Sequence, residues 1–223
     1  YLFPQFGYVL DVGDTDLIPI GAQGKVYYLS KATAEVAFQL DLFFCGVFSE
    51  GRAMAIPSSL PDGTKNTGKL HGYIDMNGSF AIPPLYEDAK AFSEGLAPVK
   101  NKGKWGYINT DGEVAIACQY ETASPFSQDG AAVNVSVPFE KDDPTTLRFL
   151  SKLIDAEGKE KAIFEDVILT DEGFCEGMAV GARFGDVRDG GGKTVYVDTS
   201  GEVVIDTEID TGRPFREGMA AIC

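Results

Sequence analysis

The sequence predicts an all-β fold: a tandem, solenoid-like array of about five three-stranded antiparallel units. Two recurring patterns predict it. Phenylalanine followed by a short turn of acidic or amide residues and glycine returns along most of the chain. A second pattern, clearest in GYINTDGEVAI (106–116), travels with it. Short alternating segments separated by glycine turns are typical of antiparallel strands. A closed, β-propeller-like array is the alternative prediction.

The first pattern begins the segments FSEGRAMAI, FSEGLAPVK, FSQDGAAVN, FCEGMAVGA and FREGMAAIC. We interpret its recurring residues as structural positions of one repeated unit: the phenylalanines are Phe48, Phe92, Phe126, Phe174 and Phe215, and the turn glycines are Gly51, Gly95, Gly177 and Gly218. We expect Phe92, with Tyr86, to fill the layer between two units.

The three strands of a unit are clearest in the third unit. LAPV (96–99), WGYIN (105–109) and EVAI (113–116) are the predicted strands, joined by turns. A linker such as residues 84–95 leads to the next unit and has room for a helical turn. The second pattern adds further structural positions: Trp105, Gly106, Tyr73, Tyr107 and Tyr196 in the second strand, and Gly78, Gly112, Gly158 and Gly201 in the following turn.

These patterns divide a single repeat domain, residues 1–223, into units. Their approximate bounds are 17–47, 48–91, 92–125, 126–173 and 174–214, with a partial unit at 215–223. One unit has too few apolar residues to offset the entropy of ordering its chain. We therefore expect neighbouring units to bury each other's faces.

Differences in unit length are concentrated between the first and second strands. Residues 57–70, 136–150 and 183–193 are polar insertions there, rich in Gly, Pro and Asp. Insertions on one side of a repeat array often form its binding surface. Drift at tolerated surface loops is the alternative explanation.

Composition excludes several classes of partner. The net charge of −15 disfavours nucleic acids and anionic membrane surfaces. The most apolar run, residues 36–48, is interrupted by Gln39 and Asp41, so no membrane span is predicted. The cysteines at 45, 118, 175 and 223 lack zinc-finger spacing and are interpreted mainly as small buried residues, with their pairing left open.

The single tryptophan and the single histidine are weak candidates for ligand binding or catalysis. Trp105 is either a stacking platform for a ligand or, as we favour, a packing residue, because Val26, His71, Ser151 and Thr194 hold its position elsewhere. His71 is the only histidine, and a structural role is favoured over that of a general base.

Acidic turn residues have two interpretations. Asp75, Asn77, Asp111 and Asp155 resemble the start of a calcium loop but lack its full spacing, which favours turn capping. The glutamates of the first pattern, Glu50, Glu94, Glu176 and Glu217, recur at one position, which favours local hydrogen bonding over catalysis. VRDGGGK (187–193) resembles a phosphate loop incompletely and is interpreted as a hairpin tip.

GKWGYINTDGEVAI and YEDAKAFSEGLAPVKNKGKWGYIN give the chain a family resemblance. Over about residues 17–223 it resembles the bacterial WG-repeat (KWG-repeat) proteins, although the Trp-Gly pair itself occurs once, at Trp105–Gly106. The resemblance implies a β-rich repeat array of bacterial origin, extracytoplasmic or at the cell surface, with no catalytic residues. The first residue is Tyr1, so we also expect a preceding segment, such as a cleaved export signal.

The predicted function is a non-enzymatic interaction module. It would bind a protein or a cell-envelope ligand, such as a glycan, through the loops between first and second strands. A carbohydrate- or cation-binding surface protein is the alternative, and an unrecognised hydrolase is the third hypothesis. No catalytic residue, metal ligand or cofactor is predicted.

Overall fold

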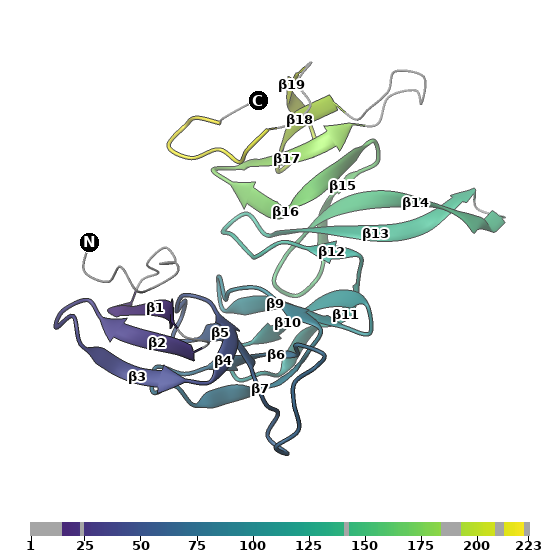
Figure 1. Cartoon of the computed structure of the whole chain (residues 1–223). Helices are drawn as coiled ribbons and strands as arrows, with labels where there is room; N and C mark the ends of the chain where they lie inside the picture. The colour runs from purple at the N-terminus through teal and green to yellow at the C-terminus, as the bar shows by residue number, and fades with distance from the viewer. Residues whose placement is uncertain (1–14, 23–24, 141–142, 184–192, 208–211, 221–223) are drawn as a thin grey trace. The chain divides into compact units, whose positions relative to one another are not determined.

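The computed structural model describes residues 15–22, 25–140, 143–183, 193–207 and 212–220 (Figure 1). The fold is all-β, as predicted: the described residues form no helix and five antiparallel sheets. Consequently, no described segment is a helix that could cross a bilayer. The chain divides into two compact units, residues 1–103 with 107–114, and residues 104–106 with 115–223.

Two sheets lie wholly within the first compact unit. The first sheet has the order β1-β2-β3 and contains β1 (Leu17–Ala22), β2 (Lys25–Ser30) and β3 (Val36–Leu40). The second has the order β4-β5-β6-β7 and contains β4 (Leu42–Cys45), β5 (Ala53–Pro57), β6 (His71–Ile74) and β7 (Phe80–Tyr86).

The third sheet contains the predicted strands 96–99, 105–109 and 113–116. Its order is β11-β10-β9-β8, with β8 (Asp88–Ala89), β9 (Leu96–Asn101), β10 (Lys104–Asn109) and β11 (Val114–Tyr120). The boundary between the two compact units runs through β10 and β11.

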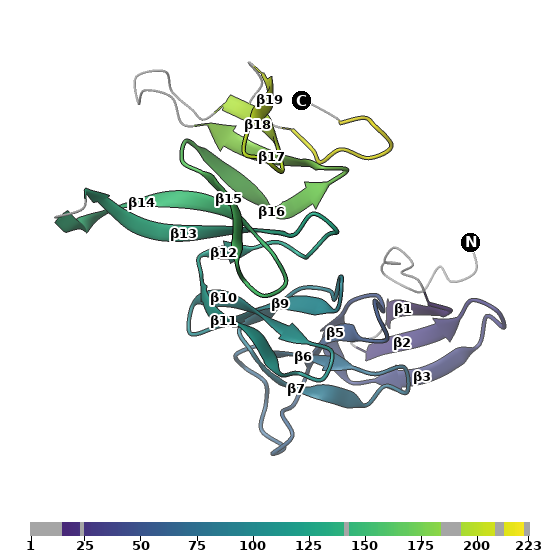
Figure 2. The same cartoon turned by 180° about the vertical axis from the view of Figure 1, so that it is seen from behind.

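Two sheets lie wholly within the second compact unit. The fourth contains β12 (Thr122–Ala123), β13 (Ala131–Glu140), β14 (Asp143–Ile154) and β15 (Glu160–Phe164) in sequence order. The fifth contains β16 (Val167–Cys175), β17 (Met178–Arg183), β18 (Lys193–Asp198) and β19 (Val203–Asp206), also in sequence order. Viewed from behind in Figure 2, β13 and β14 form a long ribbon that extends beyond β12 and β15.

The prediction of three strands in each unit is too low for four of the five sheets, which have four strands. The extra strand comes from the linker. Asp88 and Ala89 pair with Lys100 and Val99, so this part of the linker is extended and not helical. The backbone N–H of Lys90 also donates to the Pro98 carbonyl, at 3.0 Å. Pairing with a strand that follows in sequence therefore satisfies the backbone of the linker.

Aromatic pairs tie the second strand of a sheet to the segment that follows the sheet. Tyr73 is fully buried, its ring centroid lies 4.8 Å from that of Phe92, and its hydroxyl donates to the Lys90 carbonyl at 2.7 Å. The same arrangement recurs twice, with ring distances of 5.2 Å for Tyr28–Phe48 and 5.1 Å for Tyr196–Phe215. In each, the tyrosine hydroxyl donates to a backbone carbonyl 17 or 18 residues later.

Neighbouring sheets share cores within each compact unit. Tyr28 of the first sheet packs in one cluster with Leu42 and Ile74 of the second. Leu153 of the fourth sheet packs with Leu169 and Val195 of the fifth. These clusters provide the mutual burial expected of a repeat array. The residue bounds of the predicted units, and their grouping as one domain, remain predictions.

Candidate functional site

One contact recurs where consecutive sheets meet. The glycine in the turn between the second and third strands lies against the third strand of the preceding sheet. A Cβ atom added to Gly78 would lie 2.9 Å from the Phe38 ring, and one added to Gly112 would lie 3.2 Å from Ile82. At Gly158 the corresponding distance, to Ile116, is 3.4 Å. A large apolar side chain therefore fills each of these three junctions.

The junction between the fourth and fifth sheets lacks this side chain. Tyr28, Tyr73 and Tyr196 oppose Phe38, Ile82 and Ile205 in their sheets, whereas the corresponding residue of the fourth sheet, Leu153, opposes Ala162. Among the described atoms, a Cβ atom added to Gly201 would have one neighbour within 4 Å, the backbone oxygen of Ile163, at 3.7 Å. A small residue at position 162 thus leaves space beside Gly201.

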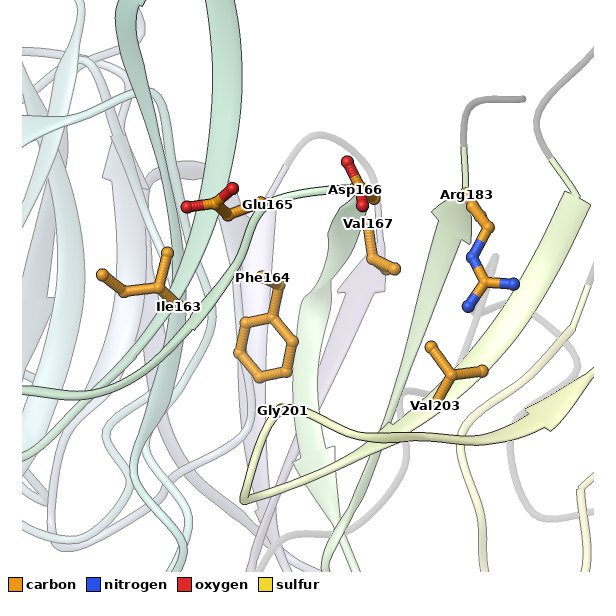
Figure 3. Close-up of a pocket in the computed structure, with 8 residues that line it drawn as sticks. All are labelled: Ile163, Phe164, Glu165, Asp166, Val167, Arg183, Gly201 and Val203. Atoms are coloured by element: carbon orange, nitrogen blue, oxygen red, sulfur yellow. The ribbon is translucent and has the colours of Figure 1, made fainter. Parts of the chain in front are cut away.

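A cleft of about 370 Å³ lies at this junction (Figure 3). Its lining comes from the end of β15, the connection to β16, the strands β16, β17 and β19, and the turn before β19: Ile163, Phe164, Glu165, Asp166, Val167, Arg183, Gly201 and Val203. Phe164 and Val167 are buried, and the Phe164 ring points toward Gly201. Ile163 is 47% exposed. The cleft therefore has an apolar floor that is open to solvent.

Acidic groups dominate the charge of the cleft. Among the described lining residues Arg183 alone is cationic, and its guanidinium contacts the carboxylate of Asp206. Glu165 and Asp166 are exposed and form no ion pair with a described residue. In Figure 3 both carboxylates lie at the end of the cleft away from Gly201. Because Asp206 neutralises Arg183, Glu165 and Asp166 give the described lining a net negative charge.

The Trp-Gly pair has a packing explanation. Trp105 is 8% exposed, so its indole is not an open stacking surface. A Cβ atom added to Gly106 would lie 2.5 Å from the Ile116 carbonyl oxygen, and one added to Gly72 would lie 2.6 Å from that of Ile82. Real Cβ atoms do not approach backbone so closely. Glycine after the Trp105 position therefore lets the third strand lie close against the second.

The family comparison agrees with this repeated geometry. The family model described as "WG containing repeat" matches residues 72–105, 105–135 and 196–223. The chain contains WG repeats over these residues. The matches include the buried Tyr73, Tyr107 and Tyr196. A search of curated proteins finds no match to this WG-repeat protein.

Solved structures of similar fold have low sequence identity to it. A structure titled "Crystal structure of the eukaryotic initiation factor" is 15% identical, with a TM-score of 0.55 over 92% of this chain and 57% of that chain. The WG-repeat protein thus spans less than two thirds of that chain, and the likeness concerns the fold alone. Two further matches are Hsv2 of Kluyveromyces marxianus (9% identity, TM-score 0.49, 97% and 68% covered) and the Cps50 (Swd1) β-propeller domain of Myceliophthora thermophila (12%, 0.43, 91% and 73%).

The three insertions of the WG-repeat protein differ in structure. Residues 58–70 form a loop closed by the buried Asn66, whose amide donates to the Pro57 and Leu70 carbonyls, both at 3.0 Å. Residues 136–150 were expected as a loop, but most of them pair as the β13–β14 ribbon. Most of 183–193, including the proposed hairpin tip at 187–192, lies outside the described residues. Its first residue, Arg183, lines the cleft.

Turn carboxylates of the WG-repeat protein accept backbone hydrogen bonds. Asp75 Oδ1 accepts from the N–H groups of Asn77 and Ser79, both at 2.9 Å, and Asp155 Oδ1 accepts from Lys159 at 2.7 Å. At Asp198, a hydrogen bond from the Ser200 hydroxyl, together with bonds from backbone N–H groups, holds the pKa of the carboxyl below its usual value. Asn77 and Asp111 contribute backbone N–H groups. Within the described ranges, no three metal-ligating side chains gather.

His71 and the cysteines have mainly structural surroundings. His71 Nε2 lies 3.8 Å from Asp88, while Nδ1 is buried without a described partner. Ser151 holds the Trp105 position in the fourth sheet. Its hydroxyl contacts Asn134 and accepts from the Leu169 N–H at 2.8 Å, which links the fourth and fifth sheets. Cys45, Cys118 and Cys175 are thiols, and burial raises the pKa of Cys45 to about 11. Cys223 lies outside the described residues.

The sequence patterns did not identify Glu165, Asp166 or Val203 as site residues. A signal was present: Ala162 follows Gly158 by the same four positions that separate Ile116 from Gly112. Replacement of a recurring large residue by alanine marks a place where packing is incomplete.

Proposed function

We propose that this WG-repeat protein is a non-enzymatic binding module for another protein, and that the cleft lined by Phe164, Val167 and Val203 is its binding site. One observation carries the proposal. Three junctions in the described chain are filled by Phe38, Ile82 and Ile116, and the fourth is open. Concave sites with an apolar floor and a few polar groups are typical binding sites.

The composition of the cleft supports binding over catalysis. The described residues of its lining include no serine, cysteine, histidine or lysine that could act as a nucleophile. Its two acidic residues, Glu165 and Asp166, are consecutive and exposed. A carboxylate pair for glycoside hydrolysis instead flanks the scissile bond from two sides of a cleft.

The carboxylates in the turns between second and third strands have a structural role, which favours a protein over a cation as the ligand. The turn carboxylates of Asp75 and Asp155 already accept backbone N–H groups. Arg183 lines the cleft and is also the first residue of the insertion at 183–193. The sequence predicted that this insertion takes part in binding, so the cleft agrees with that prediction at this residue. A glycan or cation ligand of the same surface remains the alternative.

Selection from a phage-displayed library of random peptides tests the proposal. The native chain and the variant Ala162→Ile are used as separate baits. Isoleucine at this position restores the residue found at Ile82 and Ile116, and we expect it to fill the space beside Gly201. Ala81→Ile, the same change at an exposed position of β7, is the matched control.

We expect related peptides to be enriched on the native chain and on Ala81→Ile, but not on Ala162→Ile. Equal enrichment of the same peptides on all three proteins would place binding elsewhere. Enrichment on none would contradict the proposal.

A further inference from the structure

We infer that the cleft takes an extended segment of a partner protein in which a bulky apolar side chain is followed by lysine or arginine. This inference rests on the proposed function and adds the chemistry of the ligand. Three features of the cleft carry it: the missing apolar side chain, the excess of negative charge, and the two outermost strands beside it.

The apolar part of the ligand follows from the packing defect. Phe38, Ile82 and Ile116 each lie against the turn glycine of the next sheet, whereas no described side chain lies within 4 Å of a Cβ atom added to Gly201. Phe164, Val167 and Val203 line the cleft at that junction. The volume of about 370 Å³ lies at the lower end of the range for ligand sites. One large side chain with its own backbone suits this space, and its burial removes apolar surface of both molecules from water.

The cationic part follows from the charges. Glu165 and Asp166 have no described ion-pair partner, while Arg183 is already paired with Asp206. The whole chain has a net charge of −15. A lysine or arginine next to the buried side chain would face these two carboxylates, whereas an acidic segment would be repelled.

The polypeptide nature of the ligand follows from the strands. Ile163 and Phe164 belong to β15, and Val203 belongs to β19. Both are the last strands in the order of their sheets, so one side of each is unpaired by the described strands. An extended peptide can donate and accept backbone hydrogen bonds along such an edge, which a small amine cannot do.

Fluorescence polarisation with synthetic peptides tests the inference. The labelled probe has the core Leu-Lys-Arg between Gly-Ser segments. Three matched peptides carry Ala-Lys-Arg, Leu-Glu-Glu or Leu-Ser-Ser. The proteins are the native chain, Ala162→Ile, and the double variant Glu165→Gln/Asp166→Asn. The control double variant Glu157→Gln/Asp111→Asn makes the same charge change in two exposed turns, β14–β15 and β10–β11, whose residues do not line the cleft.

We expect the Leu-Lys-Arg probe to bind the native chain and the control variant equally. Loss of either the leucine or the two basic residues should weaken binding about tenfold, as should either cleft variant. Equal weakening by the control variant would show attraction to the overall charge and would overturn the inference. So would equal binding of Leu-Ser-Ser and Leu-Lys-Arg to the native chain.

The test separates this inference from the proposed function. If Leu-Ser-Ser binds as well as the probe and Ala162→Ile still abolishes binding, the ligand chemistry is wrong but the cleft remains a binding site. If peptides selected from the random library bind Ala162→Ile as well as the native chain, the proposed function fails as well.

Discussion

The backbone N–H of Gly95 donates a hydrogen bond to the carboxylate of Glu50, at 3.0 Å, although 45 residues separate them. Both residues belong to the two-residue turns of the first pattern, in which glutamate and glycine have positive φ. Glu176 repeats the relationship, accepting from the N–H of Gly218 at 2.8 Å. Glu50 and Glu176 thus each join one turn to the next, whereas the sequence suggested a local role.

This relationship predicts that Glu176→Ala destabilises the protein. The change leaves the N–H groups of Glu217 and Gly218 without their acceptor. Because the site is exposed and water can replace the carboxylate, we expect a loss of about 1 kcal/mol in the free energy of unfolding. Urea denaturation measures it.

Glu217→Ala is the matched control. Glu217 has the same backbone conformation, with φ of 53° against 54° for Glu176, and its carboxylate accepts no hydrogen bond from the described residues. A loss as large as that of Glu176→Ala would show that the turn residue itself matters, and not the bond to the next turn.

Gly106 predicts a larger effect. Alanine would place Cβ 2.5 Å from the Ile116 carbonyl oxygen, so the second and third strands must separate. We expect Gly106→Ala to lower the free energy of unfolding by about 3 kcal/mol. At Gly46 the nearest atom to an added Cβ is 3.8 Å away, so Gly46→Ala should change stability far less. Similar losses for both variants would contradict the packing explanation of the Trp-Gly pair.

Sequence reasoning recovered the parts of the fold that are encoded locally. Alternation and turn glycines located the strands within residues 96–116, because both signals lie in consecutive residues. The strand at Asp88–Ala89 was missed because its pairing depends on Val99 and Lys100, not on its own composition. The insertion at 136–150 was expected as a loop for the same reason: its polar composition does not reveal that its two halves pair.

The candidate site could not be recognised from the sequence, because it depends on contacts between sheets. Ala162 is visible in the repeat alignment, but its consequence appears only when Gly201 is seen to lack the side chain that Gly112 and Gly158 contact. Glu165 and Asp166 belong to no repeated pattern, so only their position beside the cleft distinguishes them from other exposed acidic residues.

Cys45 predicts a decrease in stability at alkaline pH. Burial raises its pKa to about 11, above the value near 8.5 that is usual for an unfolded chain. Between these values the unfolded state releases the proton and the native state retains it. The contribution of the protonated Cys45 thiol to the free energy of unfolding is therefore complete below about pH 8.5, and it is lost as the pH rises toward 11.

Denaturation of native and Cys45→Ala proteins across this range measures the effect. We expect the native protein to lose stability more steeply with rising pH than the variant. If the stability of the two proteins changed with pH in the same way, the pKa of Cys45 would be the same in the native and unfolded states, and this prediction would be wrong.

Ala162→Ile is expected to stabilise the protein. Isoleucine would contact Phe164 and the backbone near Gly201 and fill part of the cleft, a type of change that typically adds about 1 kcal/mol. Thermal melting checks this, with Ala81→Ile as the control. A lower melting temperature for Ala162→Ile would show that the junction between the fourth and fifth sheets has no room for the isoleucine side chain.

The most direct test of the account is methyl NMR of the native chain during titration with the Leu-Lys-Arg peptide. The open junction contains Ile163, Val167 and Val203, whereas Ile82 and Ile116 lie in filled junctions. The account predicts saturable shifts of the first three methyl sets and unchanged signals from the other two. Shifts centred on Ile82 or Ile116, or none at Ile163, Val167 and Val203, would contradict it.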